Sequence, residues 1–123
     1  MTPAEDALLL LQIVDRHLVA MRVNLDPAFP DEEWGFLAQQ ALEKLLKVAI
    51  VLRDERPPFT HELRPLAALA GWTLTEELQE LQTYAVEARY QPGPFPLPAS
   101  RGDLLARLEG IRKELWQRID CGE

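Results

Sequence analysis

Apolar residues recur at helical spacing in several long stretches of the chain, and none of these stretches alternates as a half-buried strand would. The first stretch covers residues 3–23, with Thr2 as the predicted N-cap and Pro3 at the first helical position. Its apolar stripe is wide, which predicts burial on more than one side, in a core or against a partner. The second stretch covers residues 32–52, with Asp31 as the predicted N-cap, and makes a rod of about 30 Å.

Prolines and a glycine bound a short third helix. The double proline at residues 57–58 ends the second helix, because a residue before proline avoids the helical region. Gly71 suits the left-handed position that follows the last turn of a helix. The start of the short helix stays open: either Thr60 caps it, or residues 61–64 form a turn and Pro65 opens the helix.

Two further helices are predicted toward the C-terminus. A capping box over residues 73–76 opens one that continues to about residue 89, and Ser100 caps the last, which continues to about residue 119. Residues 91–99 lie between them and hold four prolines, which excludes regular structure. The prediction is a single domain, residues 1–123, folded as an all-α up-and-down helical bundle of four long helices plus one short helix.

Composition narrows the class of protein. The 123 residues are 47% hydrophobic and 27% charged, as in a globular domain that buries roughly two-thirds of its unfolded surface. Cys121 is the single cysteine, which excludes an internal disulfide and a cysteine-based zinc cage. Glu5 and Asp6 stand where a signal peptide carries basic residues, and no apolar run approaches the roughly 20 residues of a membrane span. We therefore expect a cytoplasmic protein that does not enter a membrane.

The charge is unevenly distributed. The formal net charge of −7 argues against a non-specific nucleic-acid binder. Residues 44–64 differ from the remainder, because they hold five basic and three acidic residues. This segment is either a phosphate-binding surface or an ordinary solvated helix end. Within it, Lys44 and Lys47 are three residues apart and share one face of the second helix.

The two histidines of the chain have different settings. His17 lies inside the first helix and is interpreted as a surface or helix-face residue. His61 comes five positions after Arg56, across the double proline. On such a turn a histidine could move a proton while an arginine stabilises charge on phosphorus; the alternative is a ring bonded to a backbone group. Metal-ligand spacing and nucleotide-binding loop motifs are absent from the sequence, so we expect no metal and no cofactor.

Three short elements follow one another along the chain. The first, in the second predicted helix, consists of Gln39, Gln40, Ala41, Glu43, Lys44, Leu46 and Lys47. The second is the turn Thr60, His61, Glu62 and Leu63, and the third consists of Tyr84, Arg89 and Tyr90. Together, and in this order, they resemble the HEPN domain (higher eukaryotes and prokaryotes nucleotide-binding domain).

The resemblance implies a helical bundle that usually dimerises and that often acts with a minimal nucleotidyltransferase as a toxin–antitoxin pair. In active members an arginine and a histidine, here Arg56 and His61, form a metal-independent endoribonuclease site that faces its copy across the dimer. A twofold axis supplies the second histidine, since one imidazole cannot be acid and base at once. The implied reaction is attack of a 2′-hydroxyl on the neighbouring phosphate. Pro57 stands where active members usually carry a polar residue, and Leu63 where some carry a tyrosine.

Three functions are compatible with these observations. The first is a homodimeric nucleotide-binding or accessory partner of a minimal nucleotidyltransferase, with RNA or a nucleotide as candidate ligand. The second is an endoribonuclease toxin with Arg56 and His61 as catalytic residues, and the third is a non-enzymatic helical interaction protein. The first two predict one basic groove lined by Lys44, Lys47, Arg53, Arg56, His61 and Arg89.

Overall fold

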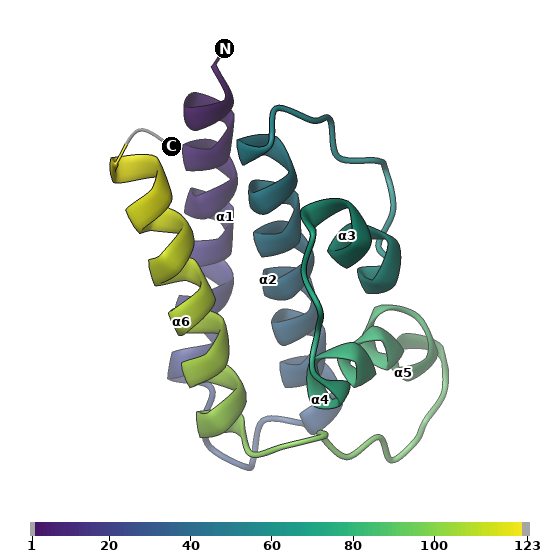
Figure 1. Ribbon diagram of the computed structural model, residues 1–123. Coiled ribbons are helices and arrows are strands. Elements are labelled where there is room, and N and C mark those ends of the chain that lie inside the picture. Colours follow the sequence, from purple (N-terminus) through teal and green to yellow (C-terminus); the bar gives the residue numbers. More distant parts are fainter. Residues whose placement is uncertain (1, 122–123) are drawn as a thin grey trace.

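Three long helices form the frame of the bundle, and the computed structural model describes residues 2–121 of it. Helices α1 (Pro3–Val23), α2 (Asp31–Leu52) and α6 (Arg101–Asp120) run side by side (Figure 1). The shorter elements lie across α2 from α6: α3 (Leu63–Ala70), α4 (Glu76–Glu80), the 3₁₀ helix η1 (Leu81–Ala85) and α5 (Glu87–Tyr90). Residues 2–121 contain no strand, so the predicted all-α bundle is confirmed.

Helix α2 forms the centre of the fold. It packs against α1, α6, α3 and η1, and 13 of its 22 residues are buried, as expected for a helix that is apolar on most sides. Helix α1 instead buries a single stripe of five residues, and Leu9 and Val19 on its outer side are about half exposed. Within one chain the first helix is therefore buried along one stripe only, and its predicted burial against a partner stays a prediction.

Capping chemistry places some of the helix ends as predicted. The Thr2 hydroxyl accepts a hydrogen bond from the Glu5 amide, and Ser100 caps α6 in the same way. Gly71 ends α3 in the left-handed conformation, with φ of 75°. The prediction for Asp31 is wrong, because Pro30 is the N-cap and the Asp31 carboxylate accepts a bond from Arg101.

The short third helix begins at Leu63, between the two predicted starts. Pro65 therefore occupies the third helical position, where the missing amide proton has no partner inside a helix. Thr60 does not cap α3; its hydroxyl accepts a bond from the Glu62 amide at 3.1 Å. The residues before α3 are thus held in a tight turn that ends in the helix.

The long helix predicted over residues 74–89 is wrong, because α4, η1 and α5 replace it. Thr75, rather than Thr73, caps the first of these pieces. In a 3₁₀ helix residues three apart stand in line, so η1 presents both Leu81 and Tyr84 to the core. Gly35 of α2 leaves room for the phenol, since a Cβ there would lie 2.5 Å from the ring of Tyr84.

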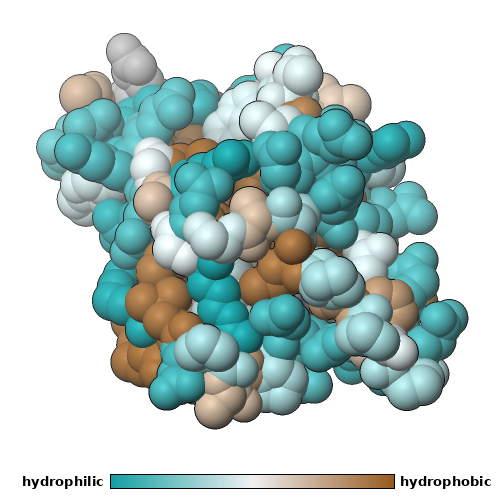
Figure 2. All heavy atoms as spheres, turned by 90° about the horizontal axis from the view of Figure 1, so that it is seen from below, coloured by the Kyte–Doolittle hydropathy of each residue, from teal (hydrophilic) through white to brown (hydrophobic). Residues whose placement is uncertain are grey.

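The end of the bundle opposite the chain termini exposes apolar side chains among polar ones (Figure 2). A hollow of about 580 Å³ opens there, with Leu25, Leu97 and Arg101 in its lining. Among the described residues, no helix has both the length and the apolar character needed to cross a membrane.

Candidate functional site

A row of polar residues on α2 forms the base of the site. Gln39 and Glu43 are the only polar side chains buried among residues 2–121, at 0% and 2% exposure. Burying them costs free energy unless their polar atoms are bonded. Both residues find partners in the segment before α3, around His61. The position of that segment is therefore coupled to the polar face of α2.

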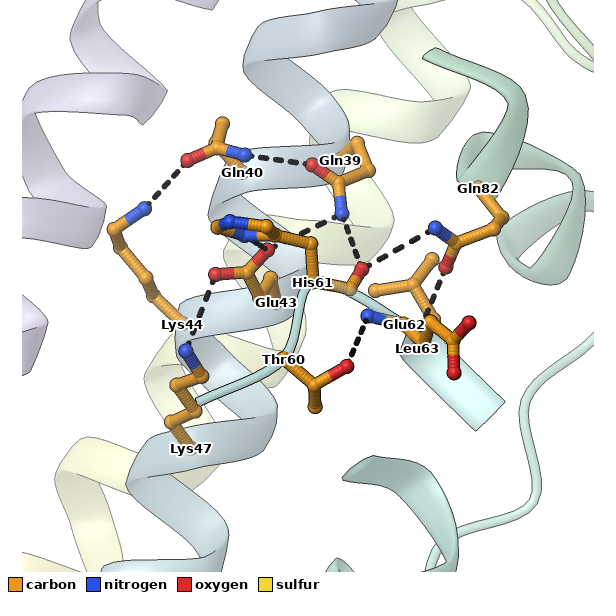
Figure 3. A network of polar contacts seen from close by, with 10 residues as sticks. All are labelled: Gln39, Gln40, Glu43, Lys44, Lys47, Thr60, His61, Glu62, Leu63 and Gln82. Carbon is orange, nitrogen blue, oxygen red and sulfur yellow. Dashed lines mark hydrogen bonds and ion pairs between the residues drawn. The ribbon is translucent and has the colours of Figure 1, made fainter. Parts of the chain in front are cut away.

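The backbone of His61 is held from two sides (Figure 3). Its carbonyl oxygen accepts hydrogen bonds from Nε2 of Gln39 at 3.0 Å and from Nε2 of Gln82 at 3.3 Å. The other end of the Gln82 amide accepts a bond from the Leu63 backbone at 2.7 Å. These bonds join α2 and η1 to the residue that carries the imidazole, so the ring starts from a fixed point.

The ring of His61 is bonded to the buried carboxylate of Glu43. Nδ1 lies 2.9 Å from Oε1, although 73% of the histidine side chain is exposed to solvent. A proton on Nδ1 directed at a carboxylate fixes the tautomer and leaves Nε2 to exchange a proton with a ligand. The second carboxylate oxygen, Oε2, lies 3.3 Å from Nζ of Lys47. Glu43 thus orients one candidate residue and pairs with another.

Lys44 and His17 extend the site toward α1. Nζ of Lys44 donates to Oε1 of Gln40 at 2.8 Å, and burial lowers the pKa of this lysine. Burial also lowers the pKa of His17, and the positive charges of Lys44 and Arg16 act in the same direction. The negative charge of Glu43 acts against these effects in both groups, so this carboxylate is close enough to influence Lys44 and His17 alike.

His17 is not the simple surface residue that its sequence setting predicts. Its side chain is half-buried, and Nε2 is enclosed without a hydrogen-bond partner. The sequence signal that was available is its spacing with the buried stripe of α1, three positions after Val14 and four before Met21. Residues at these spacings lie on the same side of a helix.

The structure brings together only part of the predicted groove. Lys44, Lys47 and His61 share the network around Glu43. The guanidinium of Arg89 lies 4.9 Å from the ring centre of Phe36, farther toward the N-terminal end of the same helix. Arg89 is therefore placed on the α2 surface by an aromatic contact, beside the polar row rather than inside it.

Two predicted residues lie elsewhere. Arg56 lines a separate hollow of about 290 Å³ together with Pro3 and Asp6, near the start of α1. The Arg53 guanidinium lies over Gly71, at a point where a Cβ would be 2.3 Å from Nη1. The six residues predicted to line one groove are thus divided among several surfaces of the single chain.

The family comparison places the chain in a known family of domains. The HEPN domain model matches residues 9–114, which is most of the chain, and the chain therefore belongs to the HEPN domain family. Neither curated proteins nor solved structures yield a significant match. The described residues contain no group of three or more histidine, cysteine or acidic side chains that could hold a metal ion.

Proposed function

We propose that this HEPN domain binds a nucleotide or RNA phosphate at the surface around His61, as the dimeric accessory partner of a minimal nucleotidyltransferase in a toxin–antitoxin-type pair. The observation that carries the binding site is the group of cations beside Glu43. Lys44 and Lys47 come from one helix. His61 is bonded to Glu43, the carboxylate that also pairs with Lys47. A single carboxylate serves both Lys47 and His61, while Lys44 bonds only a neutral amide among the described residues. An incoming phosphate would supply the missing negative charge.

The exposed side of α1 supports the homodimer in this proposal. Leu8, Leu9 and Val19 expose between 37% and 51% of their surface on one helix. Apolar side chains in such a group are typical of an interface with another chain. Light scattering of the purified protein is expected to give twice the chain mass, and a Val19→Glu variant is expected to give the monomer.

Titration with ATP in the presence of EDTA tests the nucleotide site. We expect the parent to bind and Lys44→Ala to bind several-fold more weakly, with a smaller dependence on salt. Lys113→Ala, on the exposed side of α6, is the matched control and should bind as the parent does. Equal affinities for all three proteins would remove the cations of α2 from the site. Co-purification with a minimal nucleotidyltransferase expressed from the same source tests the partner.

A metal-independent endoribonuclease is the second candidate, and the Glu43–His61 hydrogen bond favours it. A histidine oriented by a buried carboxylate can take the proton of a 2′-hydroxyl as that oxygen attacks phosphorus. The bond to the 5′-oxygen then breaks, a 2′,3′-cyclic phosphate forms, and an acid returns a proton to the leaving oxygen. In a dimer the second His61 is available as that acid.

The cleavage assay uses the full chain with EDTA and compares the parent with His61→Ala and Arg56→Ala. Cleavage that depends on His61 and yields cyclic phosphate ends supports this second function. If Arg56→Ala remains active, the arginine acts outside the reacting centre, in agreement with its separate hollow. Cleavage that persists in His61→Ala would show that the activity does not use this site.

A further inference from the structure

We propose that the hollow beside His61 holds a nucleobase, and that the phosphate of the same nucleotide lies against the cations of α2. The inference rests on the proposed function, in which the cations bind the phosphate, and adds a binding place for the base of the same ligand. The hollow measures about 660 Å³, which is within the usual range for small-molecule sites. It lies between residues 59–65 and the elements from α4 to α5, and His61 is part of its lining.

Phe59 gives the hollow an aromatic surface. Its side chain is fully exposed to solvent, and Val86 in the same lining is 55% exposed. A phenyl ring held in water beside a second apolar side chain offers a flat surface without an internal partner. Proteins that bind single-stranded nucleic acid stack bases on such rings.

The polar groups of the hollow favour a base over a phosphate. The amides of Gln79 and Gln82 already bond the backbone of Leu74 and His61, so they are occupied. The exposed carboxylates of Glu62 and Glu87 remain, and these repel phosphate but accept hydrogen bonds from amino groups.

Adenine, guanine and cytosine carry an exocyclic amino group, whereas uracil has a single N3–H donor between two carbonyl oxygens that a carboxylate repels. The carboxylates therefore predict a preference for amino-bearing bases. Arg64 also lines the hollow, but its guanidinium is directed to Gln79, with Nη2 3.4 Å from Oε1.

The two halves of the site meet at His61. Its ring is bonded to Glu43, which also pairs with Lys47, and the same residue lines the hollow. One nucleotide can therefore place its phosphate toward Lys44 and Lys47 while its base stacks on Phe59. Lys44 and Lys47 come from α2, whereas Glu62 and Glu87 line the hollow together with Arg64, whose guanidinium is directed to Gln79.

The test measures fluorescence anisotropy of labelled single-stranded RNA octamers, A8 and U8, and competition by unlabelled AMP. Phe59→Ala is expected to weaken A8 binding about five- to 150-fold. This is the range found when the aromatic side chain under one stacked base is replaced by alanine. The slope of log affinity against log salt should not change, because no charge is removed. Phe59→Tyr keeps an aromatic ring and should bind A8 as the parent does. Trp116→Ala on α6 removes an exposed aromatic ring outside the hollow, and as the control it should also bind as the parent does.

The outcomes separate this inference from the proposed function. The first outcome is that A8 binds equally to the parent and to Phe59→Ala, while the salt dependence of binding is smaller in Lys44→Ala. The proposed phosphate site would then be supported and the proposed base site would be refuted. If no octamer and no AMP binds at low salt, both are wrong. If Phe59→Ala changes light scattering from dimer to monomer without changing RNA affinity, the hollow is a self-association surface.

Competition by AMP assigns the base site to free nucleotides as well as to RNA. Equal affinity for A8 and U8 would overturn the role of the carboxylates.

Discussion

His61 and Glu43 are joined by a 2.9 Å hydrogen bond between an exposed imidazole and a carboxylate that is 3% exposed. The two residues are 18 positions apart, on the turn before α3 and in the middle of α2. The buried partner cannot move far, so it sets the orientation of the ring that solvent reaches. This arrangement separates the residue that solvent reaches from the residue that positions it.

Replacing Glu43 by glutamine is expected to separate binding from proton transfer. The amide keeps the shape of the side chain but loses the negative charge shared by Lys47 and His61. Affinity for a nucleotide phosphate should stay equal or rise, because the cations are no longer neutralised. If the chain cleaves RNA, the rate should fall by about a hundredfold or more, since the imidazole loses the negative charge that stabilises it once it has taken a proton. Parallel binding and cleavage assays check both, and a loss of affinity with full activity would contradict the prediction.

The sequence was sufficient to predict the long helices, because their periodicity and their end signals agree. The cap at Thr2 and the glycine at Gly71 depend on neighbours within four residues, and both are confirmed. The helix predicted over residues 74–89 failed because its form depends on a contact with Gly35, which lies some 50 residues away in the chain. Periodicity alone does not distinguish a 3₁₀ turn from an α-helical one when both bury the same side chains.

The candidate site was predictable only as a set of residues. His61 and the lysines of α2 could be selected by type and position, but the bond to Glu43 depends on how the turn crosses α2. Arg56 illustrates the opposite case: five positions from His61, it faces the start of α1 instead. Closeness in sequence does not imply a shared cleft where two prolines separate the residues. His17 was missed because its neighbours in the site come from another helix.

Gly35→Ala is expected to destabilise the fold by about 1–3 kcal/mol, because the new methyl group would overlap the ring of Tyr84. The ring is buried and its hydroxyl donates to the carbonyls of Phe95 and Pro96, so it cannot turn away without losing bonds. Urea unfolding measures the change. Gly110→Ala is the matched control in α6, where a Cβ meets nothing within 4 Å. That variant should gain about 0.5–1 kcal/mol from helix propensity, and a loss of equal size in both would refute the overlap.

Stability is expected to fall in alkaline solution because of Tyr84. Burial raises its pKa to about 12, and the carboxylates of Asp31 and Glu32 act in the same direction. The unfolded chain releases this proton near pH 10, so the folded state binds more protons between pH 10 and 12. The contribution of Tyr84 is therefore complete below pH 10 and is lost as the pH rises through 12, by at most about 2–3 kcal/mol.

Urea unfolding at several pH values between 8 and 11.5 measures this loss. Tyr84→Phe is the control: it should be less stable at pH 8, because two carbonyl oxygens lose their donor. Its stability should fall less between pH 10 and 11.5, since it lacks the phenol and is otherwise identical to the parent. Parallel curves for the two proteins would show that the phenol ionises equally in the folded and unfolded states.

A single arginine at the start of α6 connects that helix to the loop between α1 and α2. The guanidinium of Arg101 donates to four oxygens, those of the Asn24, Asp26 and Phe29 carbonyls and the Asp31 carboxylate. The side chain is 11% exposed and lies over the ring of Trp34. A lysine has one compact ammonium and cannot reproduce this planar set of donors. Arg101→Lys is therefore expected to lose about 1–3 kcal/mol in urea unfolding.

The same variant should expose the loop before the whole fold opens. Amides of residues 24–30 are expected to exchange hydrogen faster in Arg101→Lys, while those at the centre of α2 keep their protection relative to the global stability. Arg22→Lys is the control, because its pair with Glu109 has both side chains at least 40% exposed and contributes at most about 1 kcal/mol. Equal stabilities for the two lysine variants, with no change in loop exchange, would mean that the loop holds its shape through its own turns. The Asp26 side chain, which accepts a bond from the Ala28 amide, would then be the residue that fixes it.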